Sequence, residues 1–194
     1  MNSSSGVIGF NINSTSLVDC AELSTENIIY ILENNVTDVY GTCFTITANN
    51  ITLNCQGHTI TYAYGGIGYG VNVQYTNATI KNCIIRQYSG SNSNSYAIYA
   101  FTGTNNVDGL TVDNNNISTA GEYSYGVYVY DYCSWINVTN NVINTTGAQS
   151  TGIDLYASYF DNIIGNEINT NNGWGIDVDA GVGHDLLIKN NRIN

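Results

Sequence analysis

Apolar and polar residues alternate in short runs along most of this chain, which favours β-strands that bury one face. Two inward-type residues flank one outward-type residue in the runs at 71–73, 98–100, 127–129, 153–155 and 176–178. No stretch of helical length repeats its apolar residues at a spacing of three and four. The pattern therefore predicts an all-β protein built from many short strands.

These strands belong to a repeat that extends from Gly70 to Asn194. Each copy opens on a small residue and continues with two or three short strands. The copies begin at Gly70, Ala97, Gly126, Gly152 and Gly175, which gives a period of about 25 residues. A period of this length predicts a solenoid, and short strands stacked coil upon coil predict parallel sheets with about 4.8 Å between coils.

Each copy also carries a motif close to [VIL]-x-N-N-x-I, which is complete at 112–117, 138–143 and 188–193 and has one Asn replaced at 80–85 and 163–168. Asn tolerates the left-handed backbone angles that a sharp bend requires. Side-chain amides stacked at one height can hydrogen-bond from coil to coil. We therefore expect a right-handed parallel β-helix of about six to seven coils, with the Asn pairs at its turns.

The segment Leu53–Ile60 (LNCQGHTI) and the Asn-pair motifs resemble those of the pectin-lyase-like parallel β-helix superfamily. Within it, the chain is most similar to NosD-like proteins and to archaeal or bacterial surface-layer-type repeat proteins. The resemblance covers about Cys20 to Asn194 and implies a fold. It implies no single activity, because the superfamily includes polysaccharide lyases, hydrolases, epimerases, tailspikes, adhesins and surface-layer proteins.

We expect one β-helix domain at 20–194, with a leading coil at 20–43 and regular coils at 44–194. Residues 1–19 are expected to form an N-terminal extension. Within it Ile8, Phe10 and Ile12 alternate with glycine and asparagine, which predicts an extended strand with no partner in the repeat. The sequence shows no basic-then-apolar leader and no apolar run of about 18 residues, so neither a signal peptide nor a membrane span is predicted.

The sequence reaches Asn194 inside a complete copy of the repeat. A β-helix edge without a cap presents backbone groups that template further strands. We expect a neighbouring subunit to contact this coil through Ile188, Asn190, Asn191 and Ile193. The strand at Ile8, Phe10 and Ile12 is expected to add to a neighbour in the same assembly. The alternatives are a longer solenoid of which this chain is a fragment, and a cap folded back from the N-terminal segment.

Charge and cysteine content narrow the class of protein. Four Lys and Arg stand against fifteen Asp and Glu, a net charge of −11, which disfavours nucleic acid and anionic membranes as partners. Among the five cysteines we expect two bridged pairs, because Cys20 and Cys43 flank the leading coil and Cys55 and Cys83 occupy matching turns. The alternative is that the cysteines are reduced core residues. A Tyr-rich, mostly uncharged polar composition with bridged cysteines predicts an extracellular or cell-surface location.

Glycosylation sequons also fit an extracellular protein, although a chain rich in Asn, Ser and Thr contains many by chance. The candidate acceptors are Asn35, Asn50, Asn77, Asn116, Asn137 and Asn144.

The outward residues of the strand that opens each copy are expected to stack into two columns. We expect this stripe to bind glycan or to form a lateral contact, and its members are Tyr99, Phe101, Tyr128, Tyr130, Asp154, Tyr156, Asp177 and Asp179. Clustered carboxylates can act as an acid and base pair or as Ca²⁺ ligands. However, the four cations are scattered along the sequence, and with two His and one Met no copper or zinc ligand set can be proposed. We therefore predict no catalytic residues, no metal and no cofactor.

Together these features predict a non-catalytic extracellular structural protein. Its subunits are expected to join head to tail into a surface filament or surface layer. The alternatives are a carbohydrate-active or carbohydrate-binding β-helix that uses the stripe, and a stalk fragment of a longer surface adhesin.

Overall fold

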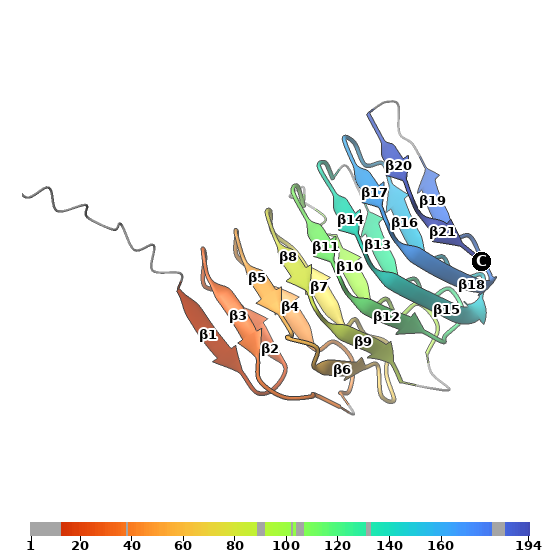
Figure 1. The fold of residues 1–194 in the computed structure, drawn as a ribbon. Coiled ribbons are helices and arrows are strands. Elements are labelled where there is room, and N and C mark those ends of the chain that lie inside the picture. Colours follow the sequence, from red (N-terminus) through yellow and green to blue (C-terminus); the bar gives the residue numbers. More distant parts are fainter. Residues whose placement is uncertain are drawn as a thin grey trace, which may run out of the picture.

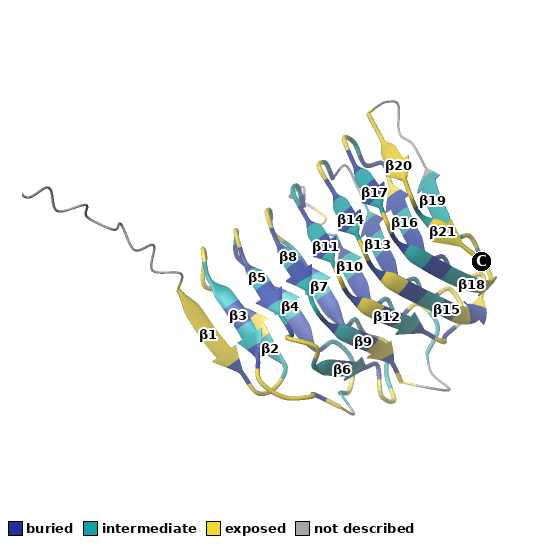
Figure 2. Cartoon of the chain, viewed as in Figure 1, coloured by how far each residue is buried: buried dark blue, intermediate teal, exposed yellow. Residues whose placement is uncertain are grey.

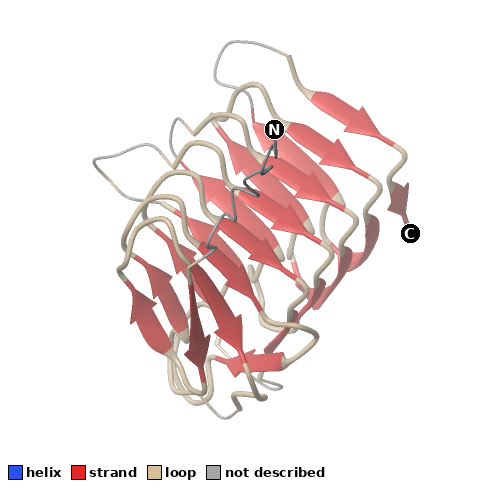
Figure 3. Ribbon diagram, turned by 60° about the vertical axis from the view of Figure 1, so that its left-hand side comes forward, coloured by secondary structure: helices blue, strands red, loops and turns tan. Residues whose placement is uncertain are grey.

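The structure is a computed structural model that describes residues 13–37, 39–88, 92–101, 103, 107–130, 133–179 and 185–194. Its 21 strands wind into a parallel β-helix, as the repeat predicted (Figure 1). In the turned view of Figure 3 the strands of successive coils stack in register, and loops connect one sheet to the next. Over these described ranges no helix is long and apolar enough to cross a membrane.

Three parallel sheets form the walls of the β-helix, and we call them A, B and C. Sheet A contains β1 (Ser14–Leu17), β3 (Ile29–Leu32), β5 (Thr52–Asn54), β8 (Thr79–Lys81), β11 (Thr111–Asp113), β14 (Asn137–Thr139), β17 (Asn162–Ile164) and β20 (Leu187–Lys189). Sheet B contains β2 (Ala21–Leu23), β4 (Phe44–Ile46), β7 (Val71–Val73), β10 (Ile98–Ala100), β13 (Val127–Tyr130), β16 (Ile153–Tyr156) and β19 (Ile176–Asp179). Sheet C contains β6 (Thr59–Tyr62), β9 (Ile84–Gln87), β12 (Asn116–Thr119), β15 (Val142–Ala148), β18 (Glu167–Asn172) and β21 (Arg192–Ile193).

Each coil passes through sheet B, then sheet A, then sheet C. Six coils contribute a strand to all three sheets, from β4–β6 to β19–β21. The core lies inside the coils, because in each strand alternate side chains point inward. In sheet A the buried column is Leu53, Ile80, Val112, Val138 and Ile163, each with no exposed surface. Figure 2 shows this alternation of buried and partly exposed positions along the strands.

Left-handed residues close the turn between sheets A and C. Asn82, Asn114, Asn140 and Asn190 have φ between 54° and 56°, as the Asn-pair motif predicted. Gly165 occupies the same place with φ 70°. Asparagine and glycine adopt this region at lower cost than other residues, so the motif encodes the turn directly.

The second Asn of each pair points inward and builds a ladder of buried amides. Asn115, Asn141 and Asn166 each donate from Nδ2 to Oδ1 of the Asn one coil further on, at 3.0 Å. The same Oδ1 atoms accept backbone N–H groups of the preceding coil at 2.9 Å. The ladder predicted from the sequence is therefore confirmed, and it joins the coils from Asn115 to Asn191.

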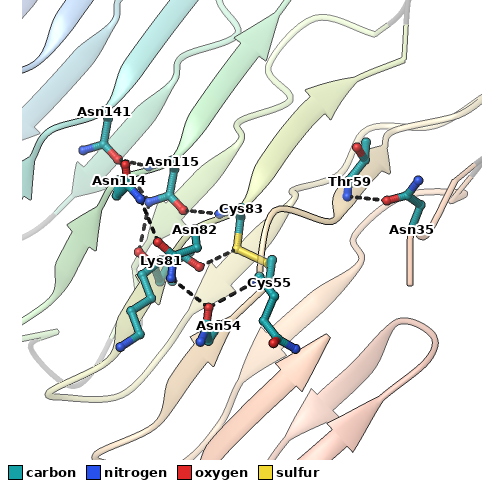
Figure 4. Close-up of a disulfide and its surroundings, with 12 residues drawn as sticks. Asn35, Asn54, Cys55, Thr59, Lys81, Asn82, Cys83, Asn114, Asn115 and Asn141 are labelled. Atoms are coloured by element: carbon teal, nitrogen blue, oxygen red, sulfur yellow. Dashed lines mark hydrogen bonds between the residues drawn. A yellow bond between two sulfur atoms is a disulfide. The ribbon is translucent and has the colours of Figure 1, made fainter. Parts of the chain in front are cut away.

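A disulfide takes the place of the amides in the earlier coils of this column. Cys55 and Cys83 are bridged, and the Cys83 N–H donates to Oδ1 of Asn115 at 2.9 Å (Figure 4). A second disulfide joins Cys20 to Cys43. Both predicted pairs are thus confirmed, and Cys133 is buried outside either bridge. Each bridge closes a loop of 23 or 28 residues, for which about 3 kcal/mol of stabilisation is typical.

The β-helix begins earlier than the expected boundary at residue 20. Strand β1 pairs in parallel with β3, from Ser14 opposite Ile29 to Leu17 opposite Leu32, so it is the first strand of sheet A. Part of the segment expected to precede the solenoid is therefore built into it. The expected strand at Ile8, Phe10 and Ile12 lies outside the described residues.

Candidate functional site

The outer face of sheet B brings the predicted stripe together. Backbone register places Tyr99 opposite Tyr128, Tyr128 opposite Asp154, and Asp154 opposite Asp177. In the second column Tyr130 lies opposite Tyr156, and the Phe101 ring lies 5.4 Å from the Tyr130 ring. The backbone of Asp179 continues this column opposite Tyr156.

A third aromatic column, which the sequence analysis did not identify, flanks these two. Tyr69, Tyr96 and Tyr125 each stand immediately before the small residue that opens a repeat copy. The signal was available as an aromatic residue at a constant offset from Gly70, Ala97 and Gly126. It was missed because the repeat was read from the small residue onward.

Eight rings pack into one continuous surface, which we call the aromatic face. Its members are Tyr69, Tyr96, Tyr99, Phe101, Tyr125, Tyr128, Tyr130 and Tyr156. Neighbouring centroids lie between 4.7 Å (Tyr69–Tyr99) and 5.9 Å (Tyr99–Phe101), in the range of favourable aromatic pairs. Most of these residues are only partly buried, so part of the aromatic face is accessible to a ligand or a neighbouring subunit.

The packing changes the acidity of the tyrosines. Burial, and then Tyr125, Tyr69 and Asp154, raise the pKa of Tyr96 to about 12. Burial also raises the pKa values of Tyr69, Tyr99 and Tyr128, and for Tyr128 the Asp154 carboxylate is the next cause. The hydroxyl groups of Tyr96, Tyr99 and Tyr128 are therefore neutral hydrogen-bond donors at neutral pH.

The positively charged side chains lie away from sheet B. All four Lys and Arg residues lie on strands of sheets A and C, namely Lys81, Arg86, Lys189 and Arg192. Asp154 and Asp177 lie next to one another on sheet B and act electrostatically on Tyr125. A polyanionic chain lying along sheet B would meet carboxylates and no cation of sheet B, whereas neutral or cationic ligands suit the charge of this surface. No group of three or more described His, Cys, Asp or Glu residues is placed to hold a metal ion.

Strands β19, β20 and β21 form a second candidate surface, which we call the open edge. Here the inward columns of sheets A and C end in Ile188 and Ile193, which are 48% and 53% exposed. Asn190 is exposed, whereas Asn191 is partly buried and accepts Nδ2 of Asn166. Figure 2 shows β20 and β21 as exposed strands beside the largely buried coils.

The candidate glycan acceptors differ in accessibility. Asn35, Asn50, Asn77 and Asn116 are exposed. Asn137 and Asn144 are partly buried, and their Oδ1 atoms accept amide groups of Asn162 and Asn169 at 2.8 Å. The exposed positions are thus sterically better acceptors than Asn137 and Asn144.

A stacked pair of exposed rings marks the turn between sheets B and A. The rings of Trp135 and Phe160 lie 5.6 Å apart, and both residues have left-handed φ values, 56° and 58°. Earlier coils place Asn27, Asn50 and Asn77 in this left-handed column. Sequence reasoning missed the pair because bulky residues are uncommon at positive φ.

Comparisons with known proteins add no family to this description. A scan against protein-family models found no match, and searches of curated proteins and of solved structures found none either. The functional assignment therefore rests on the two surfaces themselves.

Proposed function

We propose that the protein is a non-catalytic, extracellular structural β-helix whose copies stack end to end. The observation that supports stacking is the abrupt change in exposure along two otherwise uniform columns. In sheet C, Ile60, Ile85, Ile117, Ile143 and Ile168 have no exposed surface, whereas Ile193 in the same column is 53% exposed. One further coil on top would bury Ile193 as each earlier coil buries its own isoleucine.

The opposite end of sheet A presents a complementary edge. Strand β1 is paired on one side only within the sheet order, and Ser14, Thr15 and Ser16 are exposed. Parallel sheets continued from β20 of one copy to β1 of the next would satisfy backbone groups at both edges. A contact between two different edges repeats without closing on itself, so it generates a filament.

An extracellular location is supported by the two disulfides, because such bonds persist in oxidising compartments. The net charge of −11 keeps subunits soluble and disfavours nucleic acid as a partner. The bridges tie together the first coils, where a stacked subunit would dock.

Sedimentation velocity at neutral pH over a range of protein concentrations tests the stacking proposal. We expect assemblies larger than the monomer that grow with concentration. Ile193→Asp should abolish them, because it places a carboxylate in the apolar column that the next subunit covers. Val142→Asp is the matched control, since Val142 is an exposed apolar residue on the outer face of β15, away from the open edge.

Equal assembly by both variants would overturn the assignment of the open edge. A purely monomeric protein would instead direct attention to residues of a longer chain as the cover of β19–β21. In that case the open edge would belong to the interior of a longer solenoid.

The aromatic face supports a second candidate function, the binding of a neutral or cationic glycan. Half-buried rings with neutral hydroxyl groups offer flat apolar contacts and hydrogen bonds side by side. Affinity electrophoresis through gels that contain neutral polysaccharides tests this function. Retardation should be lost in Tyr99→Ala and Tyr128→Ala but retained in Tyr88→Ala, whose ring packs on Tyr64 away from this face. Retardation that all three variants share would contradict it.

A further inference from the structure

A pocket of about 360 Å³ lies where the coils turn from sheet C into sheet B. Three aromatic residues line it, and its floor and rim are polar or small. The lining includes Tyr123, Tyr125, Gln149, Thr151, Asn172 and Trp174. Its size falls within the range of small-molecule sites. Neither proposed function makes use of it.

The pocket exists because one aromatic ring is missing from a column. Backbone hydrogen bonds align one residue of each coil into a column, namely Tyr69, Tyr96, Tyr125, Thr151 and Trp174. From Tyr96 onward, the carbonyl group of each of these residues accepts a backbone N–H of the preceding coil. The rings stack from Tyr69 to Tyr96 and from Tyr96 to Tyr125, with centroids 5.7 and 5.4 Å apart. Thr151 then interrupts the stack and is itself buried. The side of Tyr125 that faces the next coil is therefore open, with Trp174 beyond it.

The distance between Tyr125 and Trp174 determines what kind of group fits between the two rings. Two coil steps separate Tyr125 from Trp174, or about 10 Å. A flat ring held between two other rings needs about 7 Å, so it would be loose here. A group midway in the gap lies about 5 Å from each ring, within the distance of about 6 Å at which a cation is attracted to an aromatic face.

A third ring and exposed aromatic surface complete the enclosure. Tyr123 has φ 52°, and this left-handed backbone, shared with Gln149 at φ 54°, belongs to the turn that forms the pocket wall. Trp174 is 66% exposed although it is one of only two tryptophans in the chain. Among the described rings, Trp174 and Tyr123 stack on no other ring, so their faces are available to a ligand.

Charge around the pocket favours a cation. The Tyr125 ring packs against Tyr128 with centroids 5.2 Å apart, and Tyr128 lies opposite Asp154, which in turn lies opposite Asp177. Burial, and then these two carboxylates, raise the pKa of Tyr125. The four Lys and Arg residues lie on strands of sheets A and C, and none lines the pocket. An anion would therefore be repelled, while a positive charge gains both carboxylate attraction and aromatic contact.

We propose that Tyr123, Tyr125 and Trp174 form an aromatic cage that binds a quaternary ammonium group. The volume admits a substituent beyond the charged head, as in choline, whose hydroxyl group can reach the amides of Gln149 or Asn172 at the rim. The site shares Tyr125 with the aromatic face, but it does not depend on glycan binding there or on subunit stacking, and its failure would leave both of those proposals standing.

Isothermal titration calorimetry with choline tests the cage against its neutral isostere, 3,3-dimethylbutan-1-ol. The two probes share their shape and differ in charge. We expect saturable binding of choline and at least about tenfold weaker binding of the alcohol, because the cation–π attraction is lost. Equal affinities, or no saturable binding of choline, would overturn the proposal.

Two variants locate the site. Thr151→Tyr restores the missing ring and should abolish choline binding by filling the gap. Trp174→Leu removes an exposed ring with little risk to the fold and should weaken binding at least about tenfold. Trp135→Leu is the matched control, since Trp135 stacks on Phe160 at a different turn, and it should bind as the parent does. Unchanged binding in Trp174→Leu would contradict the assignment even if Thr151→Tyr fails to fold.

The same ammonium chemistry occurs in free choline and in lipid headgroups. Sedimentation with phosphatidylcholine vesicles separates these sources. Protein that remains in the supernatant while binding choline indicates a soluble ligand. Protein that pellets with the vesicles, and is released by choline, indicates the headgroup. Pelleting that choline does not reverse would argue against the cage as the contact.

Discussion

The earlier and later coils of this β-helix are linked to their neighbours by different interactions at the same turn. At the turn from sheet A to sheet C, one inward column holds a disulfide at Cys55 and Cys83 and a ladder of amides from Asn115 to Asn191. The disulfide acts largely by restricting the unfolded chain. The amides act in the folded state, where each buried polar group must keep its partners. The two regions should therefore respond differently to mutation and to reducing agents.

The largest effect is expected from breaking the amide ladder. Asn141→Leu has a similar volume but removes the acceptor of two Asn115 groups and the donors to Val112 and Asn166. Because each unsatisfied buried group costs about 1–3 kcal/mol, we expect a loss of about 3–5 kcal/mol in the free energy of unfolding. Urea denaturation measures it.

The matched control is Asn144→Leu, which removes a partly buried amide on the outer face of sheet C. Its Oδ1 accepts a hydrogen bond of 2.8 Å from Nδ2 of Asn169, so the expected loss is about 1 kcal/mol or less. Similar losses in the two variants would show that the inward ladder has no special role.

Removing the Cys55–Cys83 disulfide should lower the free energy of unfolding by a smaller amount, and a second substitution should restore part of it. Replacing both Cys55 and Cys83 with Ala should lower the free energy of unfolding by about 3 kcal/mol. Replacing both with Asn should recover about 1 kcal/mol of this loss, because an amide at position 83 can join Oδ1 of Asn115 and extend the ladder. Thermal unfolding of the two double variants compares them directly. If the double Asn variant were no more stable than the double Ala variant, the amide ladder could not be extended into the coil of the disulfide.

Alkaline pH should lower the free energy of unfolding, because tyrosines of the aromatic face lose their protons. The pKa of Tyr96 is raised to about 12, above the value of about 10 for an unfolded tyrosine. The folded state therefore holds its phenol proton longer, so stability is complete below about pH 10 and is lost as the pH rises toward 12. Urea midpoints measured between pH 9 and pH 11.5 should fall, and Tyr96→Phe should reduce the slope. A flat profile over this interval would contradict the burial of these hydroxyl groups.

The smallest effect concerns the left-handed turn residue of the disulfide coil. Gln56 has φ 51° in the longer turn of this coil between sheets A and C, whereas the left-handed residue of that turn is Asn at 82, 114, 140 and 190 in later coils. Gln56→Asn should raise the free energy of unfolding by about 0.5 kcal/mol, because Asn adopts this region more readily. Gln149→Asn provides a second test at another left-handed position. A loss of stability in both would show that turn preference is not what limits these coils.

The sequence predicted much of this architecture because the repeat is regular. Alternating residues such as Val71 and Val73 identified the inward face, and the Asn pairs identified the turn and its ladder. The disulfides were predicted from Cys20 and Cys43, which flank the leading coil, and from Cys55 and Cys83, which occupy matching turns. Strand β1 was not anticipated, because its residues STSL lack the alternation of the later strands and gain their place only by pairing with β3.

Other features were not predicted, because they are local departures from the repeat. Asp161 occupies the buried position that Ile51, Leu110 and Ile136 hold in other coils, and its Oδ1 accepts the Ile136 N–H at 2.8 Å. Burial raises the pKa of this carboxyl, while hydrogen bonds from Ser158 and Ile136 oppose the rise. Thr151 similarly replaces an aromatic residue and creates the ammonium pocket. Such exceptions carry little signal in one sequence, since their meaning depends on which residues lie in the adjacent coils.

Electron microscopy of the protein at neutral pH tests the central claim of end-to-end stacking most directly. Because β20 of one copy would continue into β1 of the next, the eight strands of sheet A at about 4.8 Å each predict fibres with an axial repeat of about 38 Å. Such fibres, absent in Ile193→Asp and present in Val142→Asp, are the result that stacking through the open edge predicts. Monodisperse single particles at all concentrations would contradict it.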